Sequence, residues 1–274
     1  MRHGTAEPPE FVEPLSELVG DLDAAQRDAV AATEGPLLLI AGPGAGKTLT
    51  LIRRTLHLLT AGLAEPNEIV LCTFTEKAAL EIRDRLRSGA AAIGYTADLT
   101  GLKTGTIHGI CNEFVDRNRQ LTRLGNGYEV LDELTQSLFL FEHFDEIFGE
   151  PDADDRYLGR WATKWTAING IQRYLDKITE ELIDTSQLAS SGDPFLERLA
   201  AAHTAYEAGL IEENRVDFAH IQRHFFDLLD HPEVGPTIQR SIRNVMVDEY
   251  QDTNHIQERV LDRLSEAHRN LCVV

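Results

Sequence analysis

The run Ala41-Gly-Pro-Gly-Ala-Gly-Lys-Thr48 constrains the fold of this 274-residue chain more than any other feature. A short apolar segment, residues 36–41, leads into it, and a helix is predicted from Lys47 to about Leu59. A strand, a glycine-rich turn and a helix in this order are typical of a phosphate-binding loop. The sequence therefore predicts an α/β fold in which strand 36–41 is buried on both faces of a parallel sheet.

The residue types of this loop suit the binding of a nucleotide's phosphates. Gly44 and Gly46 allow the backbone to curl so that its N–H groups point at the phosphates, and the positive end of the following helix points the same way. Lys47 can reach the β- and γ-phosphates, and the Thr48 hydroxyl can bind Mg²⁺. The remaining loop positions expected to face the nucleotide are Gly42 and Ala45.

A second motif, Val245-Met-Val-Asp-Glu-Tyr-Gln-Asp252, places acidic residues at the end of an apolar strand. Ligands of open α/β sheets bind at the carboxyl ends of the strands. Asp248 is expected to hold Mg²⁺, and Glu249 is expected to polarise the water that attacks the γ-phosphate. Together with the loop, this motif predicts both halves of one ATP site.

Further segments complete a doubly wound sheet with a helical insertion. Additional strands are predicted at residues 68–73, 102–106, 244–248 and 271–274, with a helix at 77–87. We expect residues 1–20 to form a leader, residues 21–114 and 216–274 the α/β domain, and residues 115–215 a helical subdomain. Within that subdomain, Trp161, Trp165 and Ile168 are spaced for one helix face, which indicates a core stripe or, less favourably, an aromatic platform for bases.

Composition bears on location and on partners. No apolar segment is long enough to span a bilayer, and no signal-peptide pattern opens the chain, so we expect a cytoplasmic protein without a membrane partner. The three cysteines are scattered and indicate neither disulfides nor a zinc site. The net charge of −19 disfavours nucleic acid on average, although binding depends on the local surface.

Taken in order, five motifs resemble those of the superfamily 1 DNA helicases of the UvrD/Rep type. They are Gln26, the phosphate loop, Thr73-Phe-Thr-Glu-Lys-Ala-Ala79, Gly105-Thr-Ile-His108 and Val247-Asp-Glu-Tyr-Gln-Asp-Thr-Asn254. The resemblance implies a RecA-like, P-loop NTPase domain with a helical insertion. It also implies ATP-driven movement along single-stranded DNA, typically 3′ to 5′, with ATP and Mg²⁺ as cofactors.

The resemblance also assigns roles to single residues. Gln26 matches the glutamine that selects adenine, and its amide suits the donor and acceptor on adenine's edge. Gln251 matches the position that links the ATP site to DNA, and Arg54 matches a common arginine of less certain role. The residues that match motifs touching the DNA strand are Phe74, Lys77, Thr106 and His108.

Some positions depart from the UvrD/Rep pattern. Leu49 stands where an arginine beside the nucleotide is common, and Glu76 replaces a common asparagine. Thr106-Ile-His-Gly109 replaces the more usual Thr-Phe-His-Ser. The last two variants resemble the RecB/AddA branch, which leaves the branch open.

The family's motifs continue beyond the last residue of this sequence. A Gly-Asp-x-x-Gln segment and a second RecA-like domain, which supplies arginines to the transferring phosphoryl group, would follow Val274. We therefore expect this chain alone to bind Mg·ATP, to bind single-stranded DNA weakly, and to hydrolyse ATP slowly or not at all. A second polypeptide could supply the missing half, docking on an exposed apolar strand edge at residues 271–274.

Three other functions compete with a motor domain. A small-molecule kinase would share the phosphate loop, although the acidic motif argues against it. A non-catalytic module that binds ATP and single-stranded DNA would share every motif named above. A metal enzyme is suggested only by His220 and His224, which lack the glutamate of the zinc-protease pattern and are expected to form a surface pair on a helix.

Overall fold

The chain folds into two compact units in the computed structural model, which describes residue 16 and residues 19–274. The first unit contains the described residues up to Ile110, with 229–253 and 258–274, and the second contains residues 111–228 and 254–257. The predicted leader, residues 1–20, lies almost wholly outside the described residues. Among the described residues, no helix combines the length and the apolar character that a bilayer crossing needs.

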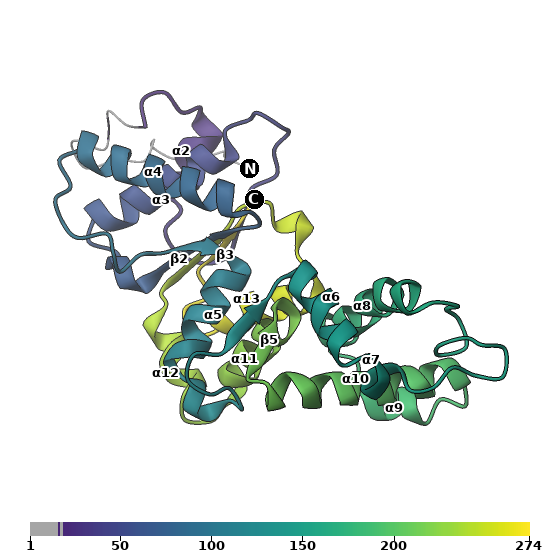
Figure 1. Ribbon diagram of the computed structural model, residues 1–274. Helices are drawn as coiled ribbons and strands as arrows, with labels where there is room; N and C mark the ends of the chain where they lie inside the picture. The colour runs from purple at the N-terminus through teal and green to yellow at the C-terminus, as the bar shows by residue number, and fades with distance from the viewer. Residues whose placement is uncertain (1–15, 17–18) are drawn as a thin grey trace, which may run out of the picture. The chain divides into compact units, whose positions relative to one another are not determined.

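The first unit is built on a five-stranded parallel sheet with the strand order β1-β7-β6-β2-β3, which confirms the predicted α/β class (Figure 1). Its strands are β1 (Leu37–Leu38), β2 (Ile69–Thr73), β3 (Lys103–Thr106), β6 (Asn244–Val247) and β7 (Leu271–Val273). Its helices are α2 (Ala24–Ala31), α3 (Lys47–Thr60), α4 (Glu76–Ala92) and α12 (Gly235–Ser241). Three helices contain a boundary between the units, namely α5 (Ile107–Arg117), α11 (Phe218–Asp230) and α13 (His255–Ser265).

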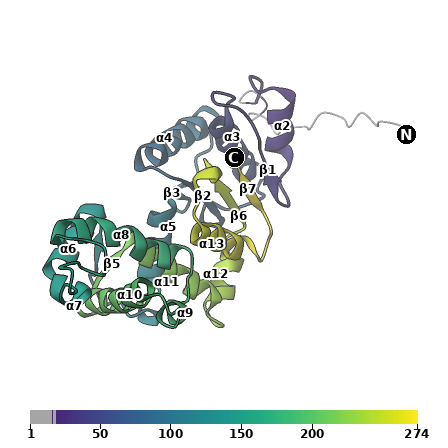
Figure 2. The same cartoon turned by 90° about the vertical axis from the view of Figure 1, so that its right-hand side faces the viewer.

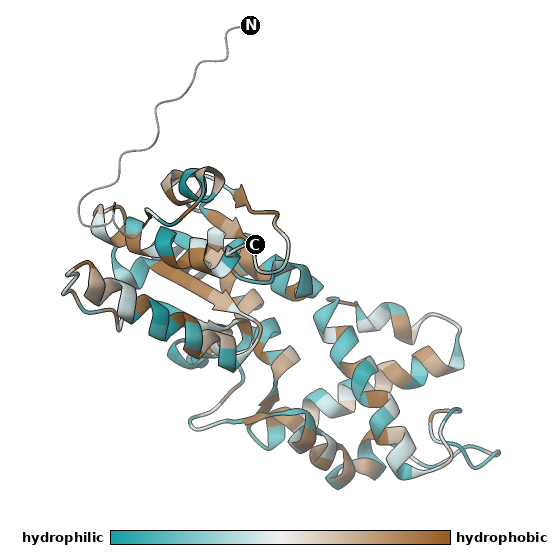
Figure 3. Cartoon of the chain, turned by 90° about the horizontal axis from the view of Figure 1, so that it is seen from above, coloured by the Kyte–Doolittle hydropathy of each residue, from teal (hydrophilic) through white to brown (hydrophobic). Residues whose placement is uncertain are grey.

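The core of this unit is built on strands that are mostly apolar and buried throughout. Every residue of β2 and β6 is buried, as expected for parallel strands covered on both faces. Figure 3 shows central strands in the brown of apolar residues. Leu51, Ile52 and Leu56 on α3 join Ile69 and Leu71 of β2 in one apolar cluster. The sheet therefore holds a rigid edge on which loops can place functional groups.

Two predictions about strands of this sheet are wrong. The strand predicted at 36–41 is reduced to the edge strand β1, where Leu38 is 62% exposed and Ile40 beyond it is 88% exposed. The segment predicted as an exposed edge, residues 271–274, forms β7, which lies between β1 and β6 with Cys272 and Val274 buried. Both segments are apolar, and their burial depends on strand order, which local sequence does not determine.

The second unit is mainly helical, as Figure 2 shows. Its helices are α6 (Glu133–Glu142), α7 (Phe144–Phe148), α8 (Lys164–Glu180), α9 (Thr185–Ala189) and α10 (Pro194–Glu212). A two-stranded parallel sheet of β4 (Glu129–Leu131) and β5 (Arg215–Asp217), which the sequence did not indicate, joins its ends. An apolar cluster that includes Phe139, Ile171 and Tyr206 forms its core.

The three residues of the predicted stripe do not share one helix face. Trp161 precedes α8, although it packs against the apolar cluster as a core residue would. Trp165 is 53% exposed and stacks on Phe141, with ring centroids 5.1 Å apart, so the prediction of a core residue is wrong there. Only Ile168 of the three is fully buried. The helix begins at Lys164 because Thr163 caps it with a side-chain hydrogen bond to the Thr166 backbone, so the helical spacing does not extend back to Trp161.

Candidate nucleotide-binding site

The phosphate loop joins β1 to α3, and two of its glycines have a left-handed backbone. Gly44 has φ of +76° and Gly46 has φ of +77°, a region that glycine adopts without the steric cost other residues meet. Gly46 is also the N-cap of α3, so the positive end of this 14-residue helix begins inside the loop. A Cβ at Gly46 would lie 2.8 Å from the Gln26 side-chain nitrogen, so a larger residue would clash with Gln26 in addition to adopting an unfavourable backbone conformation.

Gln26 lies directly against this loop. Its side-chain Nε2 donates to the Ala45 carbonyl at 2.8 Å, and its Oε1 accepts from the backbone N–H of Asp23 at 2.9 Å. The second bond belongs to a capping box, in which the Asp23 carboxylate accepts from the Gln26 backbone at 2.8 Å and fixes the start of α2. Local sequence therefore places the predicted adenine reader beside the loop.

Arg54, on α3, holds the C-terminal end of α2. Its guanidinium donates to the carbonyls of Ala29, at 2.9 Å, and Ala32 at the C-terminus of α2. Although it is charged, the side chain is only 1% exposed, and burial lowers its pKa. Arg54 thus ties α2, which carries Gln26, to α3, which carries Lys47, and this gives a structural role to a residue whose role was open.

Thr48 and Asp248 meet from opposite ends of the sequence. The Thr48 hydroxyl donates to Asp248 Oδ2 at 2.7 Å, and Asp248 is only 4% exposed. Burial raises the pKa of this carboxyl, while the hydrogen bond from Thr48 acts against that rise. Its other oxygen, Oδ1, is buried without a hydrogen-bond partner among the described residues. A hydroxyl and a carboxylate with a spare oxygen fit a hard divalent cation such as Mg²⁺.

Glu249 and its neighbours extend the site away from the loop. Lys47 Nζ lies 4.0 Å from Glu249 Oε2, and Gln251 Nε2 donates to the same oxygen at 2.5 Å. Glu249 has φ of +58°, a left-handed conformation that costs a residue with a side chain about 1–2 kcal/mol. Such strain gathers at functional positions, because the surrounding structure maintains it there. Lysine, carboxylate and amide form one connected group.

The four residues predicted to touch DNA lie at the end of β3 or shortly after β2 and β3, at the same edge of the sheet. Phe74 directly follows β2 and is half-buried, while Lys77 on α4 is exposed. Thr106 ends β3, and its hydroxyl donates to Glu76 Oε1 at 2.9 Å. Burial lowers the pKa of His108, which favours the neutral ring. Candidate nucleotide and DNA residues therefore share one edge of the parallel sheet, as open α/β sheets favour.

The basic residues of α4 differ in their surroundings. Arg83 donates to the Thr104 carbonyl of β3 at 2.7 Å, so it supports the sheet. Arg85 pairs with Glu81 one turn earlier on the same helix. Arg87 and Lys77 are exposed.

The second unit contains a polar cluster that the sequence did not indicate. His220 was expected in a surface pair with His224, but it is only 7% exposed and lies against Asp217, so that expectation is wrong. Asp217 ends β5, caps the start of α11 through the His220 backbone at 2.8 Å, and accepts from the Tyr206 hydroxyl at 2.6 Å. The position of an aspartate before a helix was the available signal.

Comparisons with known proteins agree with this geometry. The chain is 28% identical over 261 residues to the ATP-dependent DNA helicase PcrA of Bacillus subtilis, which covers 94% of this chain and 33% of that protein. It is 28% identical over 244 residues to DNA helicase II of Escherichia coli, covering 89% and 32%. The chain thus spans about a third of the length of these relatives. The UvrD/REP helicase N-terminal domain matches residues 22–274. This chain is therefore a member of the UvrD/REP helicase N-terminal domain family.

Proposed function

We propose that this chain is the ATP-binding part of an ATP-dependent DNA helicase that couples ATP hydrolysis to 3′-to-5′ movement on single-stranded DNA. The observation that carries the proposal is the 2.7 Å hydrogen bond between Thr48 of the loop and Asp248 of the acidic motif. It joins two motifs that a nucleotide site needs and that lie far apart in the sequence. We also propose residues 21–114 and 216–274 as the RecA-like domain and residues 115–215 as its helical insertion.

On the nucleotide side, each group has a distinct task. The backbone N–H groups at Gly42, Gly44 and Gly46 surround the phosphates at the start of α3, while the Ala45 N–H donates to the Gly42 carbonyl at 3.2 Å and closes the turn. Thr48 and Asp248 hold Mg²⁺, which when bound neutralises charge on the β- and γ-phosphates. Gln26, held beside the loop by Ala45, reads the adenine edge.

The Lys47–Glu249 pair suggests how the site responds to ATP. The γ-phosphate attracts Lys47 away from Glu249, because a phosphate carries more charge than a carboxylate. Glu249 can then accept a hydrogen bond from the attacking water. The Gln251 amide, now 2.5 Å from the Glu249 carboxylate, is placed to sense that change. This connection is the proposed link between the nucleotide and DNA.

For the DNA strand we propose a stacking surface at Phe74 and polar contacts from Lys77, Thr106 and His108. An aromatic ring at the end of β2 can stack on a base whatever its identity, and an exposed lysine nearby can contact a phosphate. The relatives named above are about three times longer than this chain, so we propose movement on DNA for a protein of their full length and not for this chain alone. We propose that this protein acts in the cytoplasm. A second polypeptide is proposed as one source of its remaining part.

Hydrolysis of ATP by this chain, measured with and without single-stranded DNA, tests the proposal. We expect bound ATP, slow turnover that rises with DNA, and loss of turnover in Glu249→Gln with ATP binding retained. Glu249→Gln keeps the side chain's size and removes its charge, so it separates catalysis from folding. Bound ATP and DNA without turnover under any condition would instead favour a non-catalytic binding module. Transfer of the phosphoryl group to a small molecule would favour a kinase.

A further inference from the structure

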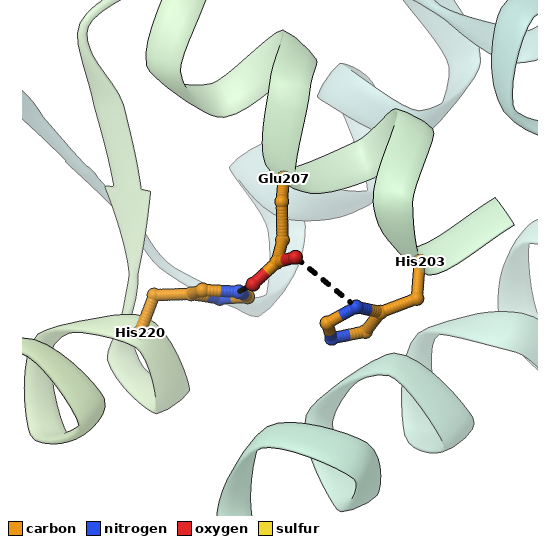
Figure 4. Close-up of side chains that lie close together, drawn as sticks. All are labelled: His203, Glu207 and His220. Atoms are coloured by element: carbon orange, nitrogen blue, oxygen red, sulfur yellow. Dashed lines mark ion pairs between the residues drawn. The ribbon is translucent and has the colours of Figure 1, made fainter. Parts of the chain in front are cut away.

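In the second unit, away from the proposed nucleotide site, the side chains of His203, Glu207 and His220 point at one another with atoms that can act as metal ligands (Figure 4). His203 and Glu207 lie one turn apart on α10, and His220 lies in the first turn of α11. One nitrogen of each ring and the Glu207 carboxylate lie within 4.8 Å of one another. Two imidazoles and a carboxylate are a ligand set that divalent transition metals favour.

The outward nitrogens of the two rings have partners that fix where the protons are. His220 Nδ1 lies 2.9 Å from both Asp217 oxygens, so this nitrogen carries hydrogen and donates. His203 Nε2 lies 3.2 Å from the Thr179 hydroxyl, which itself donates to the Leu175 carbonyl and so accepts from the ring. When both rings are neutral, the inward nitrogens, His203 Nδ1 and His220 Nε2, carry lone pairs. Asp217 and Glu207 raise the pKa of His220 to about 10 against the effect of its burial, so an ion must displace a proton from this ring.

These inward nitrogens are buried and make no hydrogen bond. His203 is 4% exposed and His220 is 7% exposed, and neither inward nitrogen has a hydrogen-bond partner among the described residues. Each lies 3.4 Å from a different oxygen of Glu207. Two buried lone pairs facing a carboxylate repel it, so a positive charge is needed between them, either as protons on the rings or as a cation.

The spacing of these atoms distinguishes the two sources of charge. A charge-assisted N–H···O bond is about 2.7–2.9 Å long. A tetrahedral ion with bonds of about 2.0–2.1 Å to nitrogen and oxygen instead holds its ligands roughly 3.4 Å apart. The His203–Glu207 and His220–Glu207 separations, both 3.4 Å and each to a different carboxylate oxygen, are longer than such a hydrogen bond and leave room for an ion between the three side chains.

His143 of the same unit shows the arrangement that protons produce. Its Nδ1 lies 3.0 Å from Glu146 and its Nε2 lies 2.8 Å from Glu213, both within hydrogen-bond geometry. The hydrogen bonds to both carboxylates raise the pKa of this ring against the effect of its burial. Both nitrogens are occupied there, so no lone pair is left for a metal. His143 is therefore a matched comparison within one fold.

We propose that His203, Glu207 and His220 bind a divalent transition-metal ion of the zinc class. Asp217 orients the His220 ring from behind, as carboxylates commonly do for metal-bound histidines. The Glu207 side chain is 46% exposed and gives the ion a route from solvent. The ion ties α10 to α11, and it leaves a fourth position for water. Its role is to stabilise the helical unit.

Titration with Co²⁺ as a spectroscopic substitute for zinc tests the site directly. The full 274-residue chain is freed of any purification tag, stripped with chelator, and titrated with Mg²⁺ in excess to occupy the oxygen ligands at Thr48 and Asp248. We expect one equivalent of Co²⁺ to give the intense visible bands of a tetrahedral site, and Zn²⁺ to abolish them. Zn²⁺ should also raise the unfolding midpoint followed by the fluorescence of Trp161 and Trp165.

Variants separate these three ligands from other groups. His203→Gln and Glu207→Gln should lose the bands and weaken Co²⁺ binding at least about tenfold, since even an outer-shell change weakens metal binding about 10–100-fold. His143→Gln should keep the bands and the affinity. Wild-type chain that shows neither visible bands nor a Zn²⁺-dependent shift would overturn the proposal and leave a proton-linked cluster. Bands that persist in both ligand variants would overturn it as well.

Discussion

The contact between Gly46 and Gln26 predicts a specific energetic coupling. Alanine at Gly46 must adopt φ of +77° and must also displace the Gln26 amide, 2.8 Å from the new Cβ. Alanine at Gly44 meets the same backbone cost at φ of +76° but has nothing within 4 Å of its Cβ. Gly44→Ala is therefore a matched control that isolates the contact with Gln26.

The magnitudes follow from those two terms. A left-handed backbone costs alanine about 1–2 kcal/mol at either position. Displacing Gln26 breaks its 2.8 Å bond to Ala45, which costs a further ~0.5–1.5 kcal/mol. Gly46→Ala should thus destabilise the nucleotide-free chain more than Gly44→Ala. In a Gln26→Ala background, where the obstacle is removed, the two substitutions should cost the same.

Denaturant unfolding of the three single variants and the two double mutants with Gln26→Ala measures this coupling. Circular dichroism follows both units, whereas tryptophan fluorescence follows only the second, because Trp161 and Trp165 are the only tryptophans. The fluorescence transition should be unchanged in every variant. An equal cost of Gly46→Ala with and without Gln26 would refute the reasoning, since it would show that the contact carries no energy.

Three further substitutions have defined outcomes. Arg54→Met should cost about 1–3 kcal/mol in denaturant unfolding, because the carbonyls of Ala29 and Ala32 lose their donor. Burial raises the pKa of Asp176 to about 6, so the folded state holds its proton as pH rises above about 4 and stability falls between pH 4 and 6. Asp176→Asn should therefore gain up to about 3 kcal/mol at pH 7 and nothing near pH 4, as measured by unfolding across pH. Phe74→Ala should weaken binding of labelled single-stranded DNA by about 1–3 kcal/mol through lost stacking.

Each of these has a result that would contradict it. Unchanged stability in Arg54→Met would mean that the buried charge costs as much as its hydrogen bonds contribute. A gain for Asp176→Asn that is the same at pH 4 and pH 7 would exclude titration as its cause. Phe74→Ala with unaltered DNA affinity, or with altered ATP affinity, would place that ring outside the DNA surface.

The sequence predicts elements well where local chemistry decides them. The mostly apolar strands β2 and β6, the loop glycines and the Asp23 cap are each determined within a few residues. The contact of Thr48 with Asp248 follows from two motifs that are recognisable separately. Their meeting at one sheet edge follows from the parallel α/β class alone.

Other features depend on neighbours that are distant in sequence. Whether apolar β1 and β7 are buried depends on strand order, and both were predicted wrongly. Trp161 fits a helical stripe by spacing, yet it lies outside the helix because α8 starts at Lys164. Trp165 lies within α8 but is 53% exposed, because the face of the helix that is buried depends on its packing partners. The meeting of His203 with His220 depends on how α10 and α11 pack, which no local pattern encodes. The RecB/AddA-like variants at Glu76 and Gly109 leave the branch of the family open.

Direct binding of Mg·ATP to this chain tests the central claim, that the loop and the acidic motif form one nucleotide site. Titration with a fluorescent ATP analogue should show Mg²⁺-dependent binding. Lys47→Ala should weaken it by more than about tenfold, since a charge-assisted contact contributes roughly 1.5–3 kcal/mol. Asp248→Asn should remove the Mg²⁺ dependence, because the cation loses its carboxylate. Equal affinity in wild type and both variants, or no binding with Mg²⁺ present, would contradict the claim.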